Sequence, residues 1–346
     1  MKSFGWPMGA AATELRSDIA RLRTEIRADL AELRRKLEEI SAPSGSVLEQ
    51  IGYKGDDSNE LYKAFVGGTE AVAASAAPIP FSSTLCQQVH FSLDQYRFWV
   101  KQMKDRPKFL RKQWEFVYVA QALYERGFLS AGKKGLAFGV GLEPLPALFA
   151  SFGCEILATD QSFESAVRAG WARSNQHSAD LSRLNDRGIC TDRMFGELVH
   201  FAAVDMNAIP AELDGSFDFC WSACSLEHLG SLRQGMEFIK NSMRTLRPGG
   251  LAIHTTEFNL SSNDRTIESA DLSLYRRSDI DALARELEAA GHAVAPIDWT
   301  RGVGLAETVV DLPPYGRGEP HLRLRIGDYD CTSIGLIVRK GEVSSN

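Results

Sequence analysis

The sequence predicts an α/β protein built on a doubly wound parallel sheet, and three observations support this. After residue 132, short apolar runs alternate with longer amphipathic stretches, which is the pattern of βαβ units. Most of the apolar runs are continuous, as expected for strands whose two faces are both buried. Glycine or acidic residues directly follow several of the runs, at the strand ends where such sheets bind ligands.

Residues 13–40 precede this region and predict a coiled-coil helix. Seven basic and seven acidic residues are interspersed there, without Gly, Pro or an aromatic residue. Apolar residues recur at steps of three or four with one stutter, as in a heptad seam: Leu15, Ile19, Leu22, Ile26, Leu30, Leu33, Leu37 and Ile40. Because so narrow a seam needs a covering surface, we expect a homo-oligomer formed through this helix, or else a helix packed on its own domain.

The chain divides by composition into three parts. Residues 1–45 contain the coiled-coil helix and a linker rich in Ser, with Pro and Gly, a composition typical of flexible connections. Residues 46–131 are expected to form a helical lid that faces the substrate. Residues 132–346 are expected to form the α/β core, which includes a long irregular insert at 301–329. Long loops of this kind often carry function.

Each element of the lid and core is predicted from its local pattern. Helices are expected at Leu85–Met103, Lys112–Arg126, Leu145–Phe152, Phe163–Gln176, Leu232–Leu246 and Ser278–Gly291. Strands are expected at Gly135–Phe138, Glu155–Ala158, Val199–Val204, Phe217–Trp221, Leu251–Thr255, Ala293–Ile297 and Thr332–Val338. The last helix begins with a pattern similar to a capping box and ends at a glycine.

The composition limits the classes of partner. The 346 residues include 39 basic and 45 acidic side chains, which gives a net charge of −6, so binding to nucleic-acid phosphates is not expected. Six cysteines without a CxxC pair or zinc-site spacing indicate a reduced, cytoplasmic location. The longest uncharged run, Ala71–Leu93, contains prolines and many polar residues, so no membrane span is expected.

A glycine turn and two acidic strand ends carry the first functional signal. Gly139 and Gly141 follow the first core strand, where their backbone can turn tightly and approach a ligand. The dinucleotide pattern G-x-G-x-x-G would need a glycine where Pro144 stands, which disfavours a NAD site. Asp160 ends the second strand, 21 residues after Gly139, where a carboxylate can accept both ribose hydroxyls of an adenosine. The pair Asp205-Met206 ends the third strand and suits the amine and the face of an adenine.

Together these motifs resemble the class I S-adenosylmethionine-dependent methyltransferases. The resemblance covers about residues 132–257 and rests on an ordered set: Gly139-Val140-Gly141, Asp160, Asp205-Met206, Phe217-Asp218, Leu226-Glu227-His228 and Leu246-Arg247-Pro248-Gly249-Gly250. It implies a seven-stranded Rossmann-like sheet, in which the last strand is antiparallel and lies beside the fifth. It also implies S-adenosylmethionine as the cofactor.

Two positions depart from the family pattern. The acidic residue that usually stands two positions before the first glycine is Ala137, and the third glycine is Glu143. Glu143 either takes over a contact to the methionine ammonium or weakens cofactor binding. With Glu143 included, the expected cofactor contacts are Gly139, Gly141, Glu143, Asp160, Gln161, Asp205, Met206, Trp221 and Ser222.

The resemblance also suggests catalytic residues. His228 is the expected base, because the matching Glu-His of many small-molecule methyltransferases lies beside the transferred methyl, and Glu257 is a second candidate base or substrate contact. His254 lies within a strand and is expected to be a core histidine. Substrate contacts are expected from four residues of the C-terminal loops, Tyr275, Arg276, Arg277 and Tyr315. No metal is expected, since the nearby carboxylates and histidines lack a recognised ligand spacing.

These observations lead to a functional interpretation with one alternative. We expect methyl transfer to a hydroxyl of a small molecule or glycan, with a surface-carbohydrate sugar as one candidate. The typical nitrogen-methylating motif is absent after strand four, where Trp221-Ser222-Ala223-Cys224 stands, so methylation of a nucleic-acid base is disfavoured. The alternative is a non-catalytic scaffold that keeps the fold and acts through its coiled-coil helix, which Ala137 and Glu143 would favour. Cofactor binding distinguishes the two.

Overall fold

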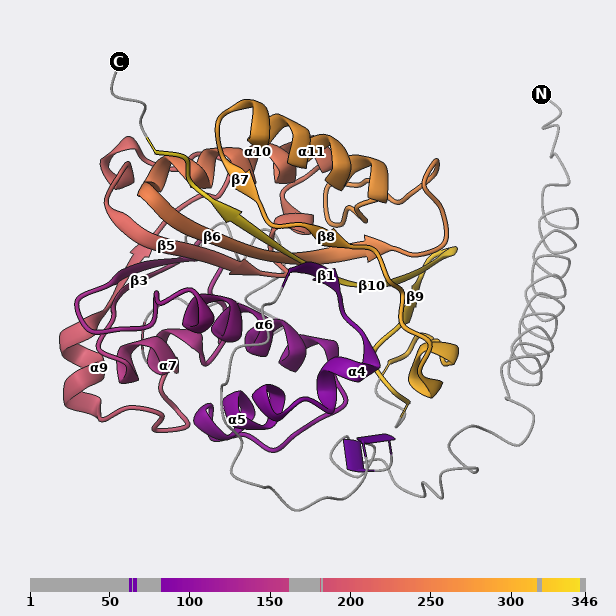
Figure 1. Cartoon of the computed structure of the whole chain (residues 1–346), viewed down its shortest axis with the longest axis horizontal. Coiled ribbons are helices and arrows are strands. Elements are labelled where there is room, and N and C mark those ends of the chain that lie inside the picture. The colour runs from indigo at the N-terminus through magenta and orange to yellow at the C-terminus, as the bar shows by residue number, and fades with distance from the viewer. Residues whose placement is uncertain are drawn as a thin grey trace, which may run out of the picture. The chain divides into compact units, whose positions relative to one another are not determined.

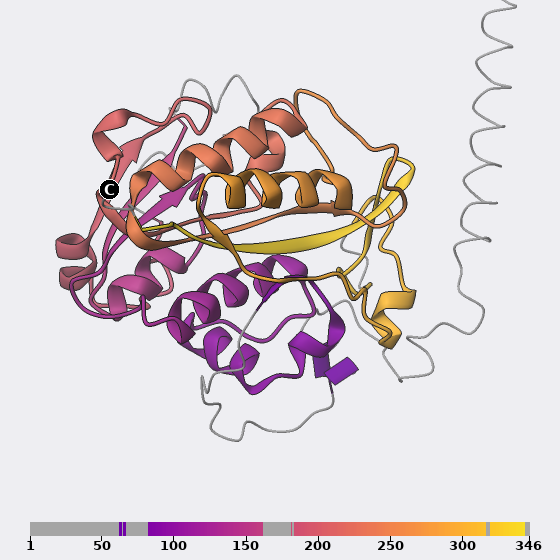
Figure 2. The ribbon, with the colours of Figure 1, turned by 45° about the horizontal axis from the view of Figure 1, so that its top comes forward.

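A computed structural model of the chain describes residues 62–63, 65–66, 82–161, 181, 183–315 and 319–342. The predicted coiled coil at 13–40 and the predicted helix at 163–176 lie outside these residues. Within them, a ten-stranded sheet has helices on both faces, with α5, α6 and α7 on one face and α10 and α11 on the other (Figure 1, Figure 2). This mixed α/β arrangement confirms the predicted fold class.

The strands are β1 (Ser83–Leu85), β2 (Lys134–Phe138), β3 (Glu155–Asp160), β4 (Val199–Ala203), β5 (Phe217–Ala223), β6 (Leu246–Asn259), β7 (Ala293–Val294), β8 (Ile297–Asp298), β9 (Leu324–Ile326) and β10 (Tyr329–Arg339). They follow the order β4-β3-β2-β5-β6-β10-β1-β8, while β7 and β9 also pair with β10. Strands β2 to β6 pair in parallel. Their carboxyl ends therefore meet at one edge of the sheet.

The long C-terminal strand β10 runs antiparallel beside β6, with Cys331 opposite Asn259 and Arg339 opposite Leu251. This confirms that the strand predicted at 332–338 lies beside the fifth core strand. The single strand predicted at 293–297 is observed as two short strands, β7, which pairs with β10, and β8, which pairs with β1. Two further short strands, β1 and β9, pair with β10 and were not predicted.

The helices are α4 (Gln88–Phe91), α5 (Asp94–Gln102), α6 (Arg111–Glu125), α7 (Leu145–Ser151), α9 (Asp192–Leu198), α10 (Leu232–Thr245) and α11 (Arg277–Ala289), with 3₁₀ turns η1 (Ala211–Leu213), η2 (Leu226–His228) and η3 (Leu305–Thr308). The single helix predicted at 85–103 is wrong. Residues 83–85 instead pair with β10, and the Cys86 amide donates to the Ser333 carbonyl at 2.8 Å. Pairing with a distant strand outweighs the local helical pattern.

Helix α6 packs closely on the sheet, and this contact positions one wall of the site. The Tyr118 ring lies over Gly335 of β10, where an added Cβ would come within 2.2 Å of Tyr118 Cε1. Both Trp114 and Tyr118 are buried. The first turn of α6 is therefore held near the carboxyl end of β6.

His254 of β6 belongs to the core, as predicted. Its Nδ1 lies 2.8 Å from the Ser222 hydroxyl and its Nε2 3.2 Å from the Ser242 hydroxyl. Burial lowers the pKa of this histidine to about 3, so the ring is neutral at physiological pH. No helix in the described ranges is long and apolar enough to cross a membrane.

Candidate active site

A cavity of about 610 Å³ opens at the carboxyl ends of the parallel strands. The ends of β2, β3 and β4 form one part of its wall, here called the β3 side. The other part, here called the β6 side, is formed by the start of α6, the end of β5 with the segment after it, Glu257 of β6 and one residue of the C-terminal insert. Because β2 and β5 are neighbours in the sheet, the two sides are continuous.

The glycine turn on the β3 side leaves no room for a side chain. Gly139 and Gly141 have φ angles of +60° and +48°, in the left-handed region that favours glycine. A Cβ on Gly139 would lie 2.7 Å from Ser225 Oγ and 3.3 Å from Met206 Sδ. The Ser225 hydroxyl also donates to the Gly139 carbonyl at 3.2 Å. The turn is thus a cradle whose backbone lines the cavity, where a ligand can approach it closely.

Acidic groups at the ends of β3 and β4 face the same cavity. Asp160 accepts hydrogen bonds from the amides of Gly141 at 3.0 Å and Gln161 at 2.8 Å. Asp205 accepts from the Asn207 amide at 2.8 Å. The predicted cofactor residues that line the cavity are Gly139, Gly141, Glu143, Asp160, Gln161, Asp205 and Met206. The cradle and these carboxylates fit the ribose and adenine of S-adenosylmethionine.

Glu143 is buried in the cavity wall and is held from behind by Trp221. The indole Nε1 donates to Glu143 Oε1 at 2.6 Å. Burial raises the pKa of Glu143 to about 8, although Trp221 and the nearby Lys112 act in the opposite direction. Trp221 and Ser222 do not line the cavity themselves: the first contacts Glu143 and the second contacts His254.

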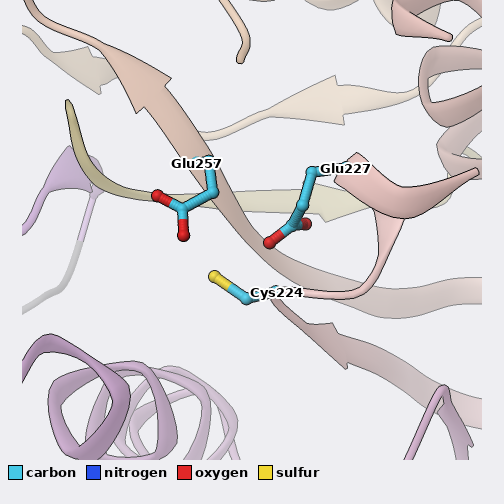
Figure 3. A group of neighbouring side chains, drawn as sticks. All are labelled: Cys224, Glu227 and Glu257. Atoms are coloured by element: carbon cyan, nitrogen blue, oxygen red, sulfur yellow. The ribbon is translucent and has the colours of Figure 1, made fainter. Parts of the chain in front are cut away.

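Three side chains of the β6 side, Cys224, Glu227 and Glu257, point toward a common space (Figure 3). Their thiol and carboxylate atoms all lie within 4.8 Å of one another. Glu257 forms an ion pair with Arg111 of α6, and the Cys224 thiol donates to Glu115 at 3.0 Å. Burial and the nearby Glu115 raise the pKa of Cys224 well above its usual value, so its thiol keeps the proton that a metal ligand must lose. The arrangement is better suited to hydrogen bonding than to metal coordination.

Glu115 connects α6 to the ends of β5 and β10. It is buried, and Lys112 Nζ lies 3.2 Å from its Oε2. The Ser333 hydroxyl also donates to it. Burial raises the pKa of Glu115, but Lys112 and Arg111 outweigh burial, so the net shift is downward. Glu115 is therefore ionised at physiological pH.

Glu227 and His228 enter the cavity from η2. The Glu227 carboxylate accepts from the Thr256 hydroxyl at 3.1 Å, and burial raises its pKa. His228 Nδ1 lies 2.6 Å from the carbonyl oxygen of Asp271. A carbonyl only accepts hydrogen bonds, so Nδ1 carries the proton and Nε2 is the basic nitrogen.

His321 also lines the cavity, although it was not among the four predicted substrate contacts. It lies in the C-terminal insert and lines the cavity together with Glu257 and Arg111. Its Nδ1 is 2.6 Å from Oδ2 of the buried Asp311. The sequence signal for it was its place in the C-terminal insert, a long loop in which function was expected. The cationic residues Arg111 and Lys112 were not predicted, because nothing in the local pattern of α6 indicates that its first turn faces the cavity.

The four predicted substrate contacts lie outside the cavity wall and hold the C-terminal loops. Tyr275 is buried and its hydroxyl donates to the Leu232 carbonyl at 3.4 Å. Arg276 pairs with Asp279 at 2.8 Å, at the start of α11. Arg277 lies over the ring of Trp299. The Tyr315 hydroxyl donates to the Arg325 carbonyl at 2.6 Å.

Comparisons with known proteins agree with this geometry. Residues 136–254 match a family model described as a methyltransferase domain. Similar solved structures include the [4+2]-cyclase SpnF (19% identity, 65% of this chain and 80% of that chain, TM-score 0.41). Others are a SAM-dependent methyltransferase from Aquifex aeolicus (18%, 64% and 88%, TM-score 0.34) and 1,6-didemethyltoxoflavin-N1-methyltransferase from Burkholderia thailandensis, with bound S-adenosylhomocysteine (18%, 67% and 79%, TM-score 0.40). No curated protein matches the sequence.

The matched residues extend from β2 into β6 and include the glycine turn, both acidic strand ends and the η2 segment that face the cavity. Residues 136–254 are therefore a methyltransferase domain, and the glycine turn and acidic strand ends within it are those expected of a domain that binds S-adenosylmethionine.

Proposed function

We propose that the protein transfers a methyl group to a hydroxyl of a small molecule or glycan, with a surface-carbohydrate sugar as one candidate. One observation carries the proposal. A single cavity combines the glycine cradle with histidine and carboxylate groups on its β6 side. A cradle for the methyl donor and proton acceptors beside it are what O-methylation needs.

The β3 side would hold the cofactor. When bound, S-adenosylmethionine supplies a methyl group on a sulfonium, which leaves as a neutral thioether. Asp160 would accept the ribose hydroxyls, Asp205 the adenine amine, and Met206 would contact the adenine face. Glu143 would face the ammonium of the methionyl group. Trp221 and Ser222 would act behind these residues, since their polar atoms contact Glu143 and His254.

The β6 side would hold the acceptor. An attacking hydroxyl must be aligned with the methyl group and must lose its proton. His228 has its ring fixed by the Asp271 carbonyl, which suits a base or an acceptor contact. Glu257 is paired with Arg111, which suits a substrate contact better than proton removal. The loops that hold Tyr275, Arg276, Arg277 and Tyr315 would shape the entrance.

We also propose the finer features of the architecture. Residues 46–131 would act as a helical lid over the cavity, which is consistent with the cavity-lining position of the first turn of α6. Residues 13–40 would form the coiled coil of a homo-oligomer. All six cysteines are unpaired, as expected in a reducing cytoplasm. The scaffold alternative loses support because Gly139 and Gly141 line the cavity although Ala137 and Glu143 depart from the family pattern.

Calorimetry with S-adenosylmethionine tests the cofactor side. We expect binding by the wild type and a loss of about tenfold or more in Gly139→Ala, because the added Cβ would clash with Ser225 in a strained backbone region. Gly127→Ala is the matched control. Gly127 also has a positive φ, +77°, but no atom lies within 4 Å of its Cβ position, so affinity should be unchanged.

Transfer of a tritiated methyl group to a panel of sugars, nucleotide sugars and phenols tests the acceptor. We expect label in an ether product of at least one hydroxyl compound. Absence of cofactor binding by the wild type would contradict the cofactor assignment. Label confined to amine or thiol acceptors in an extended panel would contradict the hydroxyl proposal.

A further inference from the structure

We propose that His321, held by Asp311, is the catalytic base that takes the proton of the acceptor hydroxyl. The inference rests on the proposed O-methylation and deepens it, because it assigns proton removal to a pair outside the family's strand-end motifs. Both residues lie in the C-terminal insert, and His321 lines the cavity on the same side as Glu257 and Arg111.

The geometry of the pair defines which ring nitrogen can react. His321 Nδ1 is 2.6 Å from Asp311 Oδ2. An ionised carboxylate only accepts hydrogen bonds, so Nδ1 carries the proton and Nε2 carries the lone pair. The Asp311 side chain is only 2% exposed, whereas 24% of the His321 side chain is exposed. The carboxylate is thus buried behind the ring, and the ring remains accessible to a substrate.

The second carboxylate oxygen of Asp311 also supports the role of His321 as the base. Oδ1 is buried and has no hydrogen-bond partner within the part of the chain that the structure describes. While His321 is neutral, the buried charge of Asp311 has few hydrogen-bond donors to stabilise it. It gains a full ion pair when His321 takes a proton. Proton transfer to Nε2 therefore relieves an unfavourable feature of the resting site.

His228 and Glu257 are less well equipped for the same task. The hydrogen-bond partner of His228 Nδ1 is the neutral carbonyl of Asp271, and the Glu227 carboxylate acts on the ring through its charge. In contrast, a buried carboxylate that is hydrogen-bonded to the ring orients it and also stabilises the charged form. Glu257 is already engaged by Arg111. Of these three groups, His321 is the one whose protonated form is stabilised by a buried carboxylate hydrogen-bonded to its ring.

Backbone pairing holds the pair in place before any substrate binds. The Asp311 amide donates to the Arg323 carbonyl at 2.8 Å, and the Arg325 amide donates to the Asp311 carbonyl at 2.9 Å. The His321 carbonyl accepts from the Arg111 amide at 3.2 Å, which ties the histidine to the first turn of α6. A site fixed by such contacts is preorganised for catalysis.

Groups from several elements surround the pair. Tyr315 and Glu319 come from the same insert, and the Tyr315 ring centroid lies 5.6 Å from that of His321. Arg111 of α6, Glu257 of β6 and Cys331 of β10 come from other elements. Arg111 is balanced by Glu257. The nearest ionised partner of His321 therefore remains Asp311.

The proposed step balances in atoms and charge. The acceptor O–H proton moves to His321 Nε2, and an oxygen lone pair forms the new bond to the methyl carbon. The electron pair of the broken carbon–sulfur bond stays on sulfur, which gives a methyl ether and S-adenosylhomocysteine. The imidazolium then returns its proton to water.

The first test uses full-length variants with a hydroxyl acceptor that the wild type methylates. We expect His321→Ala to lower kcat by about 100-fold or more, the usual contribution of a general base, with cofactor affinity unchanged. Added imidazole should restore part of the activity, because it supplies the missing base. His200→Ala, a change at an exposed histidine of β4, is the matched control and should leave kcat unchanged.

The second test examines Asp311 as a positioning residue. Asp311→Asn should lower kcat by about tenfold or more without raising KM, because the amide no longer selects the reactive tautomer, and Asp311→Glu should regain part of the rate. Nitrogen-15 spectra of labelled histidine in the cofactor-free protein give a second readout. His321 should be protonated at Nδ1 in the wild type and lose that preference in Asp311→Asn.

The outcomes separate this inference from the proposed function. A wild type that binds the cofactor but methylates no hydroxyl compound overturns O-methylation, and this inference with it. A wild type that methylates a hydroxyl while His321→Ala keeps its kcat leaves O-methylation intact and overturns the role of His321. Activity lost together with cofactor affinity, and not restored by imidazole, would show a structural role and would also overturn it.

Discussion

At the scale of single residues, Glu143 is a carboxyl in the glycine turn that is costly to ionise. It is buried, and the neutral indole N–H of Trp221 donates a hydrogen bond to its carboxyl group. Burial raises its pKa from 4.5 to about 8. Between these values the folded state keeps a proton that the unfolded state has lost, so stability must fall as the pH rises through this window. Above pH 8 both states are ionised and the effect levels off.

We predict that Glu143→Gln removes this pH dependence. The glutamine can still accept the hydrogen bond from Trp221 but cannot ionise, so the variant should exceed the wild type in free energy of unfolding near pH 8.5, by an amount on the order of 5 kcal/mol at most. Urea unfolding at pH 5, 6.5 and 8.5 measures it. Glu212→Gln, at an exposed position, should follow the wild-type curve. Parallel curves for Glu143→Gln and the wild type would contradict the prediction.

The residues of the β3 side could be predicted because each one follows directly from a local pattern. Gly139 and Asp160 stand at the ends of apolar runs, and parallel strands bring such ends together. Arg111 and Glu257 are 146 residues apart, and nothing in either local pattern indicates that they meet. Their pairing depends on how α6 packs over β6 and β10, which is a tertiary contact.

At the scale of elements, α6 is joined to the sheet by a nearly buried ion pair. The side chains of Arg111 and Glu257 are 11% and 8% exposed. Removing one partner of such a pair leaves an uncompensated charge in a poorly solvated site, whereas removing both is far less costly. The pair should therefore specify the position of α6 more than it adds to stability.

We predict a strong energetic coupling between these two residues. Arg111→Met should destabilise the fold by about 3 kcal/mol, and the double variant Arg111→Met/Glu257→Gln should cost clearly less than the sum of the single changes. A double-mutant cycle of unfolding free energies measures the coupling. The same cycle on Arg193 and Glu197 of α9, which are 87% and 61% exposed, should give about 0.5 kcal/mol or less. Equal coupling in both cycles would refute the role of burial.

The main elements of the core could be predicted from periodicity, whereas the extra strands could not. Continuous apolar runs indicated β2, β3, β4, β5 and β6, with bounds that differ by a few residues from those observed. The segment at 83–85 has no strand pattern of its own and pairs only because β10 offers it an antiparallel edge. Short edge strands of this kind depend on their partners.

At the scale of the whole molecule, the charge is unevenly distributed along the chain. Residues 13–40 carry seven basic and seven acidic side chains, so the net charge of −6 belongs almost entirely to the rest of the protein. The charged side chains of the cavity wall are also mostly acidic. The acidic ones include Asp160, Asp205, Glu115, Glu227 and Glu257, and the basic ones are Arg111 and Lys112. This favours a neutral or cationic acceptor over a phosphate-rich one.

We predict that the seam of residues 13–40 sets the oligomeric state and is separate from catalysis. Leu22 and Leu33 lie on the apolar seam, so Leu22→Asp/Leu33→Asp should turn an oligomer into a monomer, because a charge in a coiled-coil seam cannot be buried without a partner. Sedimentation velocity on the full chain measures the mass. Thr24→Asp/Ala28→Asp adds the same charge off the seam and should leave the mass unchanged. Cofactor affinity should stay the same in both variants, since the cavity-lining residues in the described part of the chain all lie outside this segment. A monomeric wild type would favour the helix packed on its own domain, and in that case the seam change should lower stability instead of mass.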